Sequence, residues 1–136
     1  MADHVTPERR SFIMSSVRSK DTKPELLVRR ALHKLGYRYR VHSRDLPGSP
    51  DLVFSSRKKA IFVHGCFWHG HGCQWGRLPK SKLDYWKPKI EANRKRDKRN
   101  LTALREAGWS VKVVWQCELR NMEATLDRIV GFLEGD

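Results

Sequence analysis

The sequence has few acidic residues, no long apolar run and no signal peptide. Only 15 Asp and Glu stand against 28 Lys and Arg, which gives a net charge of +13. This excess favours a polyanion, nucleic acid first, as the partner. The longest near-continuous apolar stretch is Ala60–Val63, whereas a membrane-spanning helix needs about 18 residues. Residues 1–4 lack signal-peptide character, so we expect a cytoplasmic protein that does not enter a membrane.

Cysteine is also scarce. The three cysteines, Cys66, Cys73 and Cys117, cannot all pair with one another, and thiols in a cytosolic protein stay reduced. Metal binding is therefore the better expectation, and the cysteines then need a fourth ligand. With 136 residues, a hydrophobic fraction of 39% and five Trp, the chain can bury the core of one domain. We expect residues 1–136 to form that single domain.

Apolar spacing predicts a mixed α/β fold. Thr22 and Glu25 have the spacing of a capping box, which would open a helix that ends at Gly36. The apolar face of that helix comprises Leu27, Val28, Ala31, Leu32 and Leu35. The other expected elements are a short basic helix within 6–20, strands at 37–41, 51–54, 60–64 and 109–115, a helix at 83–107 and a closing helix around 126–133. This order is typical of a central sheet of at least four strands flanked by helices.

Two of these elements carry a more specific expectation. Both alternating faces of strand 60–64 are apolar, so this strand should be central to a sheet that is covered on two sides. Pro88 lies within the predicted helix 83–107, where proline is tolerated only in the first turn, so we expect that helix to begin at a cap near Asp84.

A dense group of metal-binding residue types follows the predicted central strand. Within ten residues the chain has His64, Cys66, His69, His71 and Cys73. If strand 109–115 pairs beside strand 60–64, Cys117 arrives next to this group. Three thiolates and one imidazole form the tetrahedral ligand set of a structural zinc. Spacing does not choose between His69 and His71, and the plainer alternative is a set of buried thiols beside surface histidines.

The segment from Pro50 to His64 has the outline of a restriction-endonuclease active site. In such sites an aspartate at the start of one strand faces residues on the next strand, and Asp51 has that position. The usual second carboxylate and lysine are absent here, so an ordinary turn aspartate is the competing interpretation. One carboxylate can still hold magnesium, and His64 or His69 can accept a proton in place of lysine.

Four stretches together resemble the very short patch repair (Vsr) DNA mismatch endonucleases. They are Pro47-Gly48-Ser49-Pro50-Asp51, Phe62-Val63-His64-Gly65-Cys66-Phe67-Trp68-His69-Gly70-His71, Lys89-Ile90-Glu91-Ala92-Asn93, and Gly108-Trp109 to Trp115. The resemblance implies a restriction-endonuclease-like fold with a structural zinc. It also implies a magnesium-dependent enzyme that nicks one strand 5′ of the thymine in a T:G mismatch left by deamination of 5-methylcytosine.

The resemblance assigns roles to individual residues. It gives zinc to Cys66, His71, Cys73 and Cys117. It leaves His64 and His69 for catalysis, with Asp51 and the main-chain carbonyl of Val63 as magnesium ligands. Close relatives can carry threonine where this chain has Val63, and a backbone ligand survives that change. Glu25 keeps two interpretations, a capping-box partner of Thr22 or a carboxylate that orders water around the metal.

The same resemblance indicates how DNA is held. Phe67, Trp68 and Trp86 would act as an aromatic wedge between base pairs, and Met14 would enter from the other groove. Lys89 and Asn93 are candidates to read the mismatched bases. The cationic residues around the middle of helix 83–107 are Lys87, Lys89, Arg94, Lys95, Arg96, Lys98 and Arg99. We expect several of them to contact phosphate, against the alternative of a solvated basic face.

The resulting hypothesis is a monomeric bacterial-type mismatch endonuclease that acts on double-stranded DNA, in concert with other repair proteins. Residues 1–20 would form a basic helical arm on the DNA. Two alternatives stay open, a zinc-stabilised DNA-binding module that cleaves nothing and a site-specific restriction endonuclease of the same fold.

Overall fold

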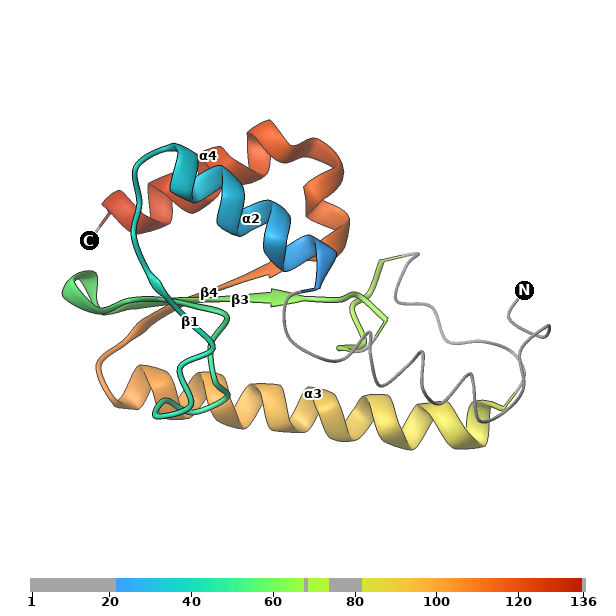
Figure 1. Cartoon of the computed structure of the whole chain (residues 1–136). Helices are drawn as coiled ribbons and strands as arrows, with labels where there is room; N and C mark the ends of the chain where they lie inside the picture. The colour runs from blue at the N-terminus through green and yellow to red at the C-terminus, as the bar shows by residue number, and fades with distance from the viewer. Residues whose placement is uncertain (1–21, 68, 74–81, 136) are drawn as a thin grey trace.

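The computed structural model describes residues 22–67, 69–73 and 82–135, in which a four-stranded sheet lies between two layers of helices (Figure 1). The helices are α2 (Lys23–Lys34), α3 (Leu83–Glu106) and α4 (Met122–Glu134), with 3-10 helices η2 (Ser55–Arg57) and η4 (Gln116–Asn121). The strands are β1 (Arg40–Val41), β2 (Leu52–Phe54), β3 (Lys59–His64) and β4 (Ser110–Trp115). The predicted mixed sheet with flanking helices is confirmed.

The sheet has the strand order β1-β2-β3-β4. β1 pairs with β2 and β2 with β3 in antiparallel fashion, whereas β3 and β4 are parallel and join Lys59 to Ser110 and His64 to Trp115. A parallel pair needs a long crossover connection, and α3 supplies it. This pairing confirms that β3 is an inner strand and that the end of β4 lies beside the end of β3.

The two faces of the sheet bury different helices. α2 and α4 cover one face, and their side chains Val28, Leu32, Ile129 and Leu133 join Leu52, Phe54, Ile61, Val63 and Val114 in one core. α3 crosses the opposite face (Figure 1). Its residues Trp86, Ile90 and Leu104 are buried, and so are Ala60 and Phe62 of β3. The double covering explains why β3 reads as apolar on both faces.

Several local predictions need correction. The predicted capping box is wrong, because the Thr22 side chain makes no cap hydrogen bond and the Glu25 carboxylate contacts Arg29 and His42. The apolar face of α2 is narrower than predicted, since Leu27 and Leu35 are exposed at 40% and 57%. Pro88 lies inside α3 rather than in its first turn, because the helix already begins at Leu83.

The expected strand 37–41 shortens to Arg40–Val41 for a packing reason. Tyr37 and Tyr39 instead lay their rings against Phe54, at centroid distances of 6.3 and 5.7 Å. The expected helical arm 1–20 and its residue Met14 lie outside the described residues, as does Trp68. No helix in the described part of the chain is long and apolar enough to cross a membrane.

Candidate active site

A cavity of about 310 Å³ lies where the turn before β2 and the end of β3 meet α2 and α3. It is lined by five residues that the sequence singled out for catalysis, Glu25, Asp51, Val63, His64 and His69. Asn93, Arg96 and Asp97 of α3 close its other side. Residues that are far apart in the chain therefore converge on one hollow large enough for part of a nucleotide.

The turn before β2 positions Asp51 by packing tightly on α3. Ser49 N–H donates to the Leu46 carbonyl at 3.0 Å, and Gly48 has a φ of +78°. A Cβ added at Gly48 would lie 2.9 Å from Cβ of Asn100, so only glycine fits both the turn and the helix surface. The sequence Pro47-Gly48-Ser49-Pro50 thus delivers Asp51 to a defined place.

Asp51 points across to β3. Its Oδ2 accepts the Val63 backbone N–H at 2.7 Å. Burial raises the pKa of the Asp51 carboxyl to about 7; the Val63 N–H opposes this shift and the Glu25 carboxylate adds to it. In the protein alone this carboxyl is therefore only partly ionised near pH 7. A cation placed among such crowded carboxyl groups would favour their charged forms.

Glu25 is buried, with only 2% of its surface exposed. Its Oε2 lies 3.2 Å from Arg29 Nη1 and 2.6 Å from His42 Nε2. Glu25, His42 and Asp51 each offer one ligand atom, and these atoms all lie within 4.8 Å of one another. Glu25 is therefore held at the cavity by tertiary contacts, which favours its role near a metal over the role of a helix cap.

His64 and His69 form a stacked pair. Their ring centroids lie 3.8 Å apart with an interplanar angle of 3°. Burial and the neighbouring His69 lower the pKa of His64 to about 3, so its imidazole is neutral at pH 7. His64 Nδ1 is buried and has no hydrogen-bond partner among the described residues. A buried nitrogen of this kind is one that a bound water or phosphate oxygen would satisfy.

Asp97 completes this arrangement from α3. Its Oδ2 lies 2.5 Å from Nδ1 of His69. With Nδ1–H donated to this carboxylate, the tautomer of His69 leaves Nε2 as a proton acceptor. A carboxylate that orients an imidazole is the arrangement by which many hydrolases prepare a general base.

The loop that carries His69 and His71 also packs closely on α3. Gly70 has a φ of +63°, and a Cβ added there would come within 2.7 Å of Ile90 Cγ2 and Arg94 Cδ. Glycine at this position lets the loop pass close to the helix and sends its two histidines in different directions. His69 joins the cavity and His71 joins the cysteines.

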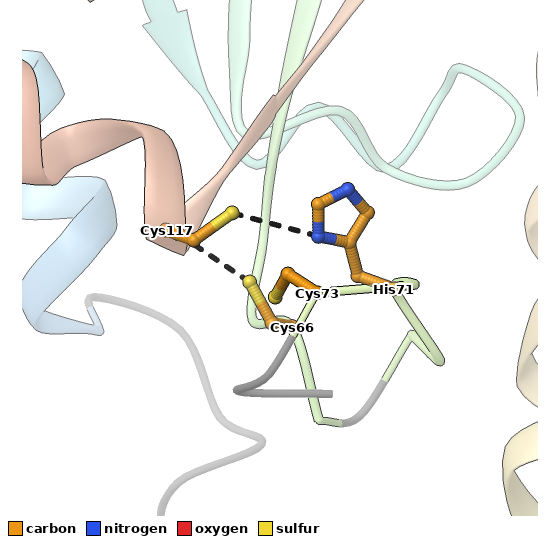
Figure 2. A group of neighbouring side chains, drawn as sticks. All are labelled: Cys66, His71, Cys73 and Cys117. Atoms are coloured by element: carbon orange, nitrogen blue, oxygen red, sulfur yellow. Dashed lines mark hydrogen bonds between the residues drawn. The ribbon is translucent and has the colours of Figure 1, made fainter. Parts of the chain in front are cut away.

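The second cluster contains Cys66, His71, Cys73 and Cys117, whose side chains converge in Figure 2. One ligand atom from each lies within 4.8 Å of the others. Cys117 Sγ is 3.5 Å from His71 Nδ1, and the Cys117 N–H donates to Cys66 Sγ at 3.3 Å. Tetrahedral zinc with bonds of about 2.0–2.3 Å needs donor atoms nearly this close, so the geometry and chemistry of these residues fit zinc.

Burial disfavours the charged forms of two thiols of this cluster, Cys66 and Cys117. Burial raises the pKa of Cys66 to about 12 and also raises the pKa of Cys117. Zinc binds thiolates, so loading the cluster would release protons. Parallel pairing of β3 with β4 brings Cys117 to Cys66, as the sequence predicted.

The predicted DNA-contacting residues have different environments. Phe67 packs edge-on against Trp86, with centroids 5.1 Å apart, and Trp86 is only 4% exposed. Trp86 would therefore have to leave the protein interior to enter DNA. Lys89 is accessible and contacts the Tyr85 ring, whereas Asn93 is 5% exposed and lines the cavity.

Sequence reasoning missed Asp97 as a cavity residue and His42 as the partner of Glu25, and it named Arg96 only among the helix cations expected to contact phosphate. Asp97 had a weak signal, since it interrupts the apolar face of a long basic helix. His42 had none, because a half-exposed strand end is an ordinary place for histidine, and the basic helix surface gave no reason to place Arg96 in the cavity. Their relation to the cavity follows only from how α2, β1 and α3 pack.

Comparison with known proteins gives consistent results. The family model described as DNA mismatch endonuclease Vsr matches residues 2–75. A type II nicking enzyme of Xanthomonas oryzae pv. oryzae, V.XorIIP, is 59% identical over 134 residues, 98% of either chain. V.NmeAIP, a type II nicking enzyme of Neisseria meningitidis serogroup A, is 46% identical and covers 95% of this chain and 92% of its own. The DNA mismatch endonuclease Vsr of Escherichia coli is 39% identical, over 93% of this chain and 81% of its own.

Proposed function

This chain belongs to the DNA mismatch endonuclease Vsr family, and we propose that it nicks duplex DNA 5′ of the thymine in a T:G mismatch. The observation that carries the proposal is the single cavity in which Asp51, Glu25, His64 and His69 converge. A DNA-binding module that cleaves nothing would not need two carboxyl groups and a carboxylate-oriented imidazole in one hollow.

The proposed reaction is the hydrolysis of one phosphodiester bond. Asp51 and the main-chain carbonyl of Val63 would hold Mg²⁺, with Glu25 ordering the surrounding water. When bound, the ion would stabilise negative charge on the phosphate and lower the pKa of a coordinated water molecule. The crowding of Glu25 and Asp51, and the raised pKa of Asp51, support a cation site at this end of the cavity.

His69 is the proposed general base. Its Nε2 takes a proton from the attacking water while Asp97 holds Nδ1 and stabilises the imidazolium that forms. The water oxygen bonds to phosphorus, and the bond to the 3′ oxygen breaks. The 3′ oxygen leaves with the bonding electrons and takes a proton from solvent water, so the products are a 5′-phosphate and a 3′-hydroxyl. His64 stays neutral and offers its unpartnered Nδ1 to the water shell or to the phosphate. One site on an asymmetric mismatch meets one strand, so the product is a nick made by a monomer.

Zinc is proposed in the cluster of Cys66, His71, Cys73 and Cys117. These residues lie at the end of β3, in the following loop and just after β4. A four-coordinate zinc there would tie the loop that carries Phe67 and His69 to the sheet. Its role is structural, because all four ligand positions come from the protein.

Preference for T:G is proposed to arise from the cost of opening the base stack. Phe67, Trp68 and Trp86 would form the wedge, with Met14 in the opposite groove and Lys89 reaching base edges. Separating stacked bases costs a few kcal/mol, and a mismatched pair gives up less. Because Trp86 is buried in the protein alone, wedge insertion would be accompanied by movement of the Phe67–Trp86 pair.

The test is a nicking assay on matched duplexes. Three duplexes carry T:G, T:A or C:G at one position, and each is incubated with and without Mg²⁺. We expect one nick on the thymine strand of T:G only, and only with Mg²⁺. Binding without cleavage would support the non-catalytic module, and cutting of both strands of a matched duplex would support a restriction endonuclease.

A further inference from the structure

The cavity contrasts with the rest of the chain in its charge. Glu25, Asp51 and Asp97 line it, and among its described lining residues Arg96 is the only lysine or arginine. The whole chain has 28 such residues, so the described lining of the cavity is poor in cations for a protein of this composition. A phosphodiester entering this hollow meets three carboxyl groups, which repel it when ionised. Arg96 is the one permanently charged lining group that attracts it.

A buried partner holds Arg96 in place. Nη2 of Arg96 donates to Oδ1 of Asn93 at 2.7 Å. Asn93 lies one turn earlier on α3 and is 5% exposed, so its amide is fixed by the packing around it. A guanidinium has five N–H donors, and this contact uses one. Arg96 is otherwise exposed, so its remaining donors can reach a bound anion.

Arg96 is adjacent in sequence to the residue that orients His69. Asp97 follows it on α3 and lies 2.5 Å from His69 Nδ1. One helical segment therefore supplies the orienting carboxylate, the guanidinium and the amide that holds the guanidinium. Because a helix is rigid, the distance between the general base and the cation is set before substrate arrives.

We propose that Arg96 is a catalytic residue that binds a non-bridging oxygen of the phosphodiester being cut, with Asn93 as its positioning residue. The inference rests on the proposed function and deepens it. A guanidinium fork matches two phosphate oxygens and stabilises the charge that grows on them in the transition state. Asn93 takes this positioning role through its Oδ1.

The first test measures single-turnover nicking of the T:G duplex at saturating enzyme. Arg96→Ala should lower the rate by about 10²–10³-fold, because a charged donor to the transition state is lost. Arg96→Lys should recover part of the rate, since it keeps the charge without the fork. Asn93→Ala should lower the rate less than Arg96→Ala and add little to it in the double variant. Arg105→Ala removes the same charge from an exposed position of α3 outside the cavity and should leave the rate unchanged.

The second test does not depend on cleavage. Binding is compared, without divalent ions, for duplexes with a phosphate or an uncharged methylphosphonate at the bond 5′ of the thymine. The parent should prefer the phosphate by about tenfold, and Arg96→Ala should lose this preference while Arg105→Ala keeps it. Equal preference in parent and Arg96→Ala, or an unchanged nicking rate of Arg96→Ala, overturns the inference. Failure of the parent to nick T:G overturns the proposed function instead, and the binding comparison still decides the role of Arg96.

Discussion

At the scale of single residues, two of the three acidic groups that line the cavity, Asp51 and Asp97, have opposite environments. Asp51 accepts a backbone N–H and is buried, with a pKa raised to about 7. Asp97 is partly exposed and contacts an imidazole instead of a backbone group. The first is suited to a cation and the second to steering a proton.

Replacing Asp51 by Asn should abolish nicking and leave DNA binding intact. The amide is isosteric and can still accept the Val63 N–H, so the fold is kept while the negative charge is lost. Gel-shift and nicking assays on one T:G duplex measure the two properties. Asp45→Asn is the control, because Asp45 is an exposed carboxylate in the loop before β2. Full activity of Asp51→Asn would contradict the proposed metal site.

Asp97→Asn should reduce the nicking rate by about 10²–10⁴-fold, the range for loss of a functional general base. An asparagine at this place favours the wrong tautomer of His69 and cannot stabilise its charged form. His69→Ala should cost a similar factor, and the double variant should be no slower than His69→Ala alone. If the rate loss of the double variant instead equalled the product of the losses of the two single variants, Asp97 and His69 would act independently and the pairing would be refuted.

At the scale of elements, the loop between β3 and α3 contributes residues to the cavity and to the cysteine and histidine cluster. Gly70 lies between His69, which lines the cavity, and His71, which joins the cysteines. Gly70→Ala should destabilise the protein by roughly 1–3 kcal/mol, since the new Cβ meets Ile90 and Arg94 in a backbone conformation unfavourable for alanine. Nicking should fall with it, because His69 moves away from Asp97. Gly72→Ala is the matched control, as its added Cβ has nothing within 4 Å. Thermal unfolding that ranks the two variants equally would contradict this account.

The segment after α2 is tied to the end of α4 by a titratable contact. Tyr37 donates its hydroxyl to Glu134 at 2.5 Å, and Arg57 lies 3.5 Å from the same carboxylate. The hydrogen bond from Tyr37, with the charge of Arg57, lowers the pKa of Glu134. The bond to Glu134 raises the pKa of Tyr37. The contact therefore stabilises the fold at pH values at which Glu134 is ionised and Tyr37 is protonated. This stabilisation is lost at acid pH, where Glu134 takes up a proton, and at alkaline pH, where Tyr37 loses one.

Tyr37→Phe should lower the thermal midpoint at pH 7, and the difference from the parent should shrink as the pH falls toward about 3. Protonation of Glu134 removes the charge that strengthens the bond in the parent, whereas the variant keeps only the contact between Glu134 and Arg57 and so loses less. Tyr39→Phe is the control, because the Tyr39 hydroxyl donates to the Arg29 carbonyl, which does not titrate. A Tyr37→Phe deficit that stays constant with pH would rule out this linkage.

At the scale of the whole molecule, the cysteine and histidine cluster connects β3, the loop after it and the end of β4. Cys117→Ser should reduce zinc content and thermal stability together, with a loss of several kcal/mol. Chelator should lower the stability of the parent toward that of the variant. Metal analysis of protein purified without chelator should find one zinc per chain. Its absence would eliminate the proposed structural site.

Residue types and their spacing were sufficient to predict an inner strand 60–64 and a group of metal-binding residue types after it. Spacing left His69 and His71 undivided, and only the resemblance to the Vsr family assigned His69 to the same site as Asp51 and His64. Adjacent strands were sufficient to bring Cys117 to Cys66, since only one pairing of two apolar strands was needed. Contacts between elements could not be predicted, because they depend on packing. Glu25 has capping-box spacing, yet its carboxylate contacts His42 and Arg29 and does not form the predicted box. The local sequence pattern does not contain these tertiary contacts, so it could not predict them.

The order of the strands has a consequence for how the enzyme is made. Every residue that lines the cavity precedes β4 in the chain, yet β3 has no parallel neighbour until Ser110 and the residues after it are synthesised. Pairing between such distant segments forms late and slowly in folding. A nascent chain on the ribosome therefore carries all the groups of the nuclease site before the sheet that aligns them exists. The groups of this site can be aligned for cutting DNA only after β4 has been synthesised.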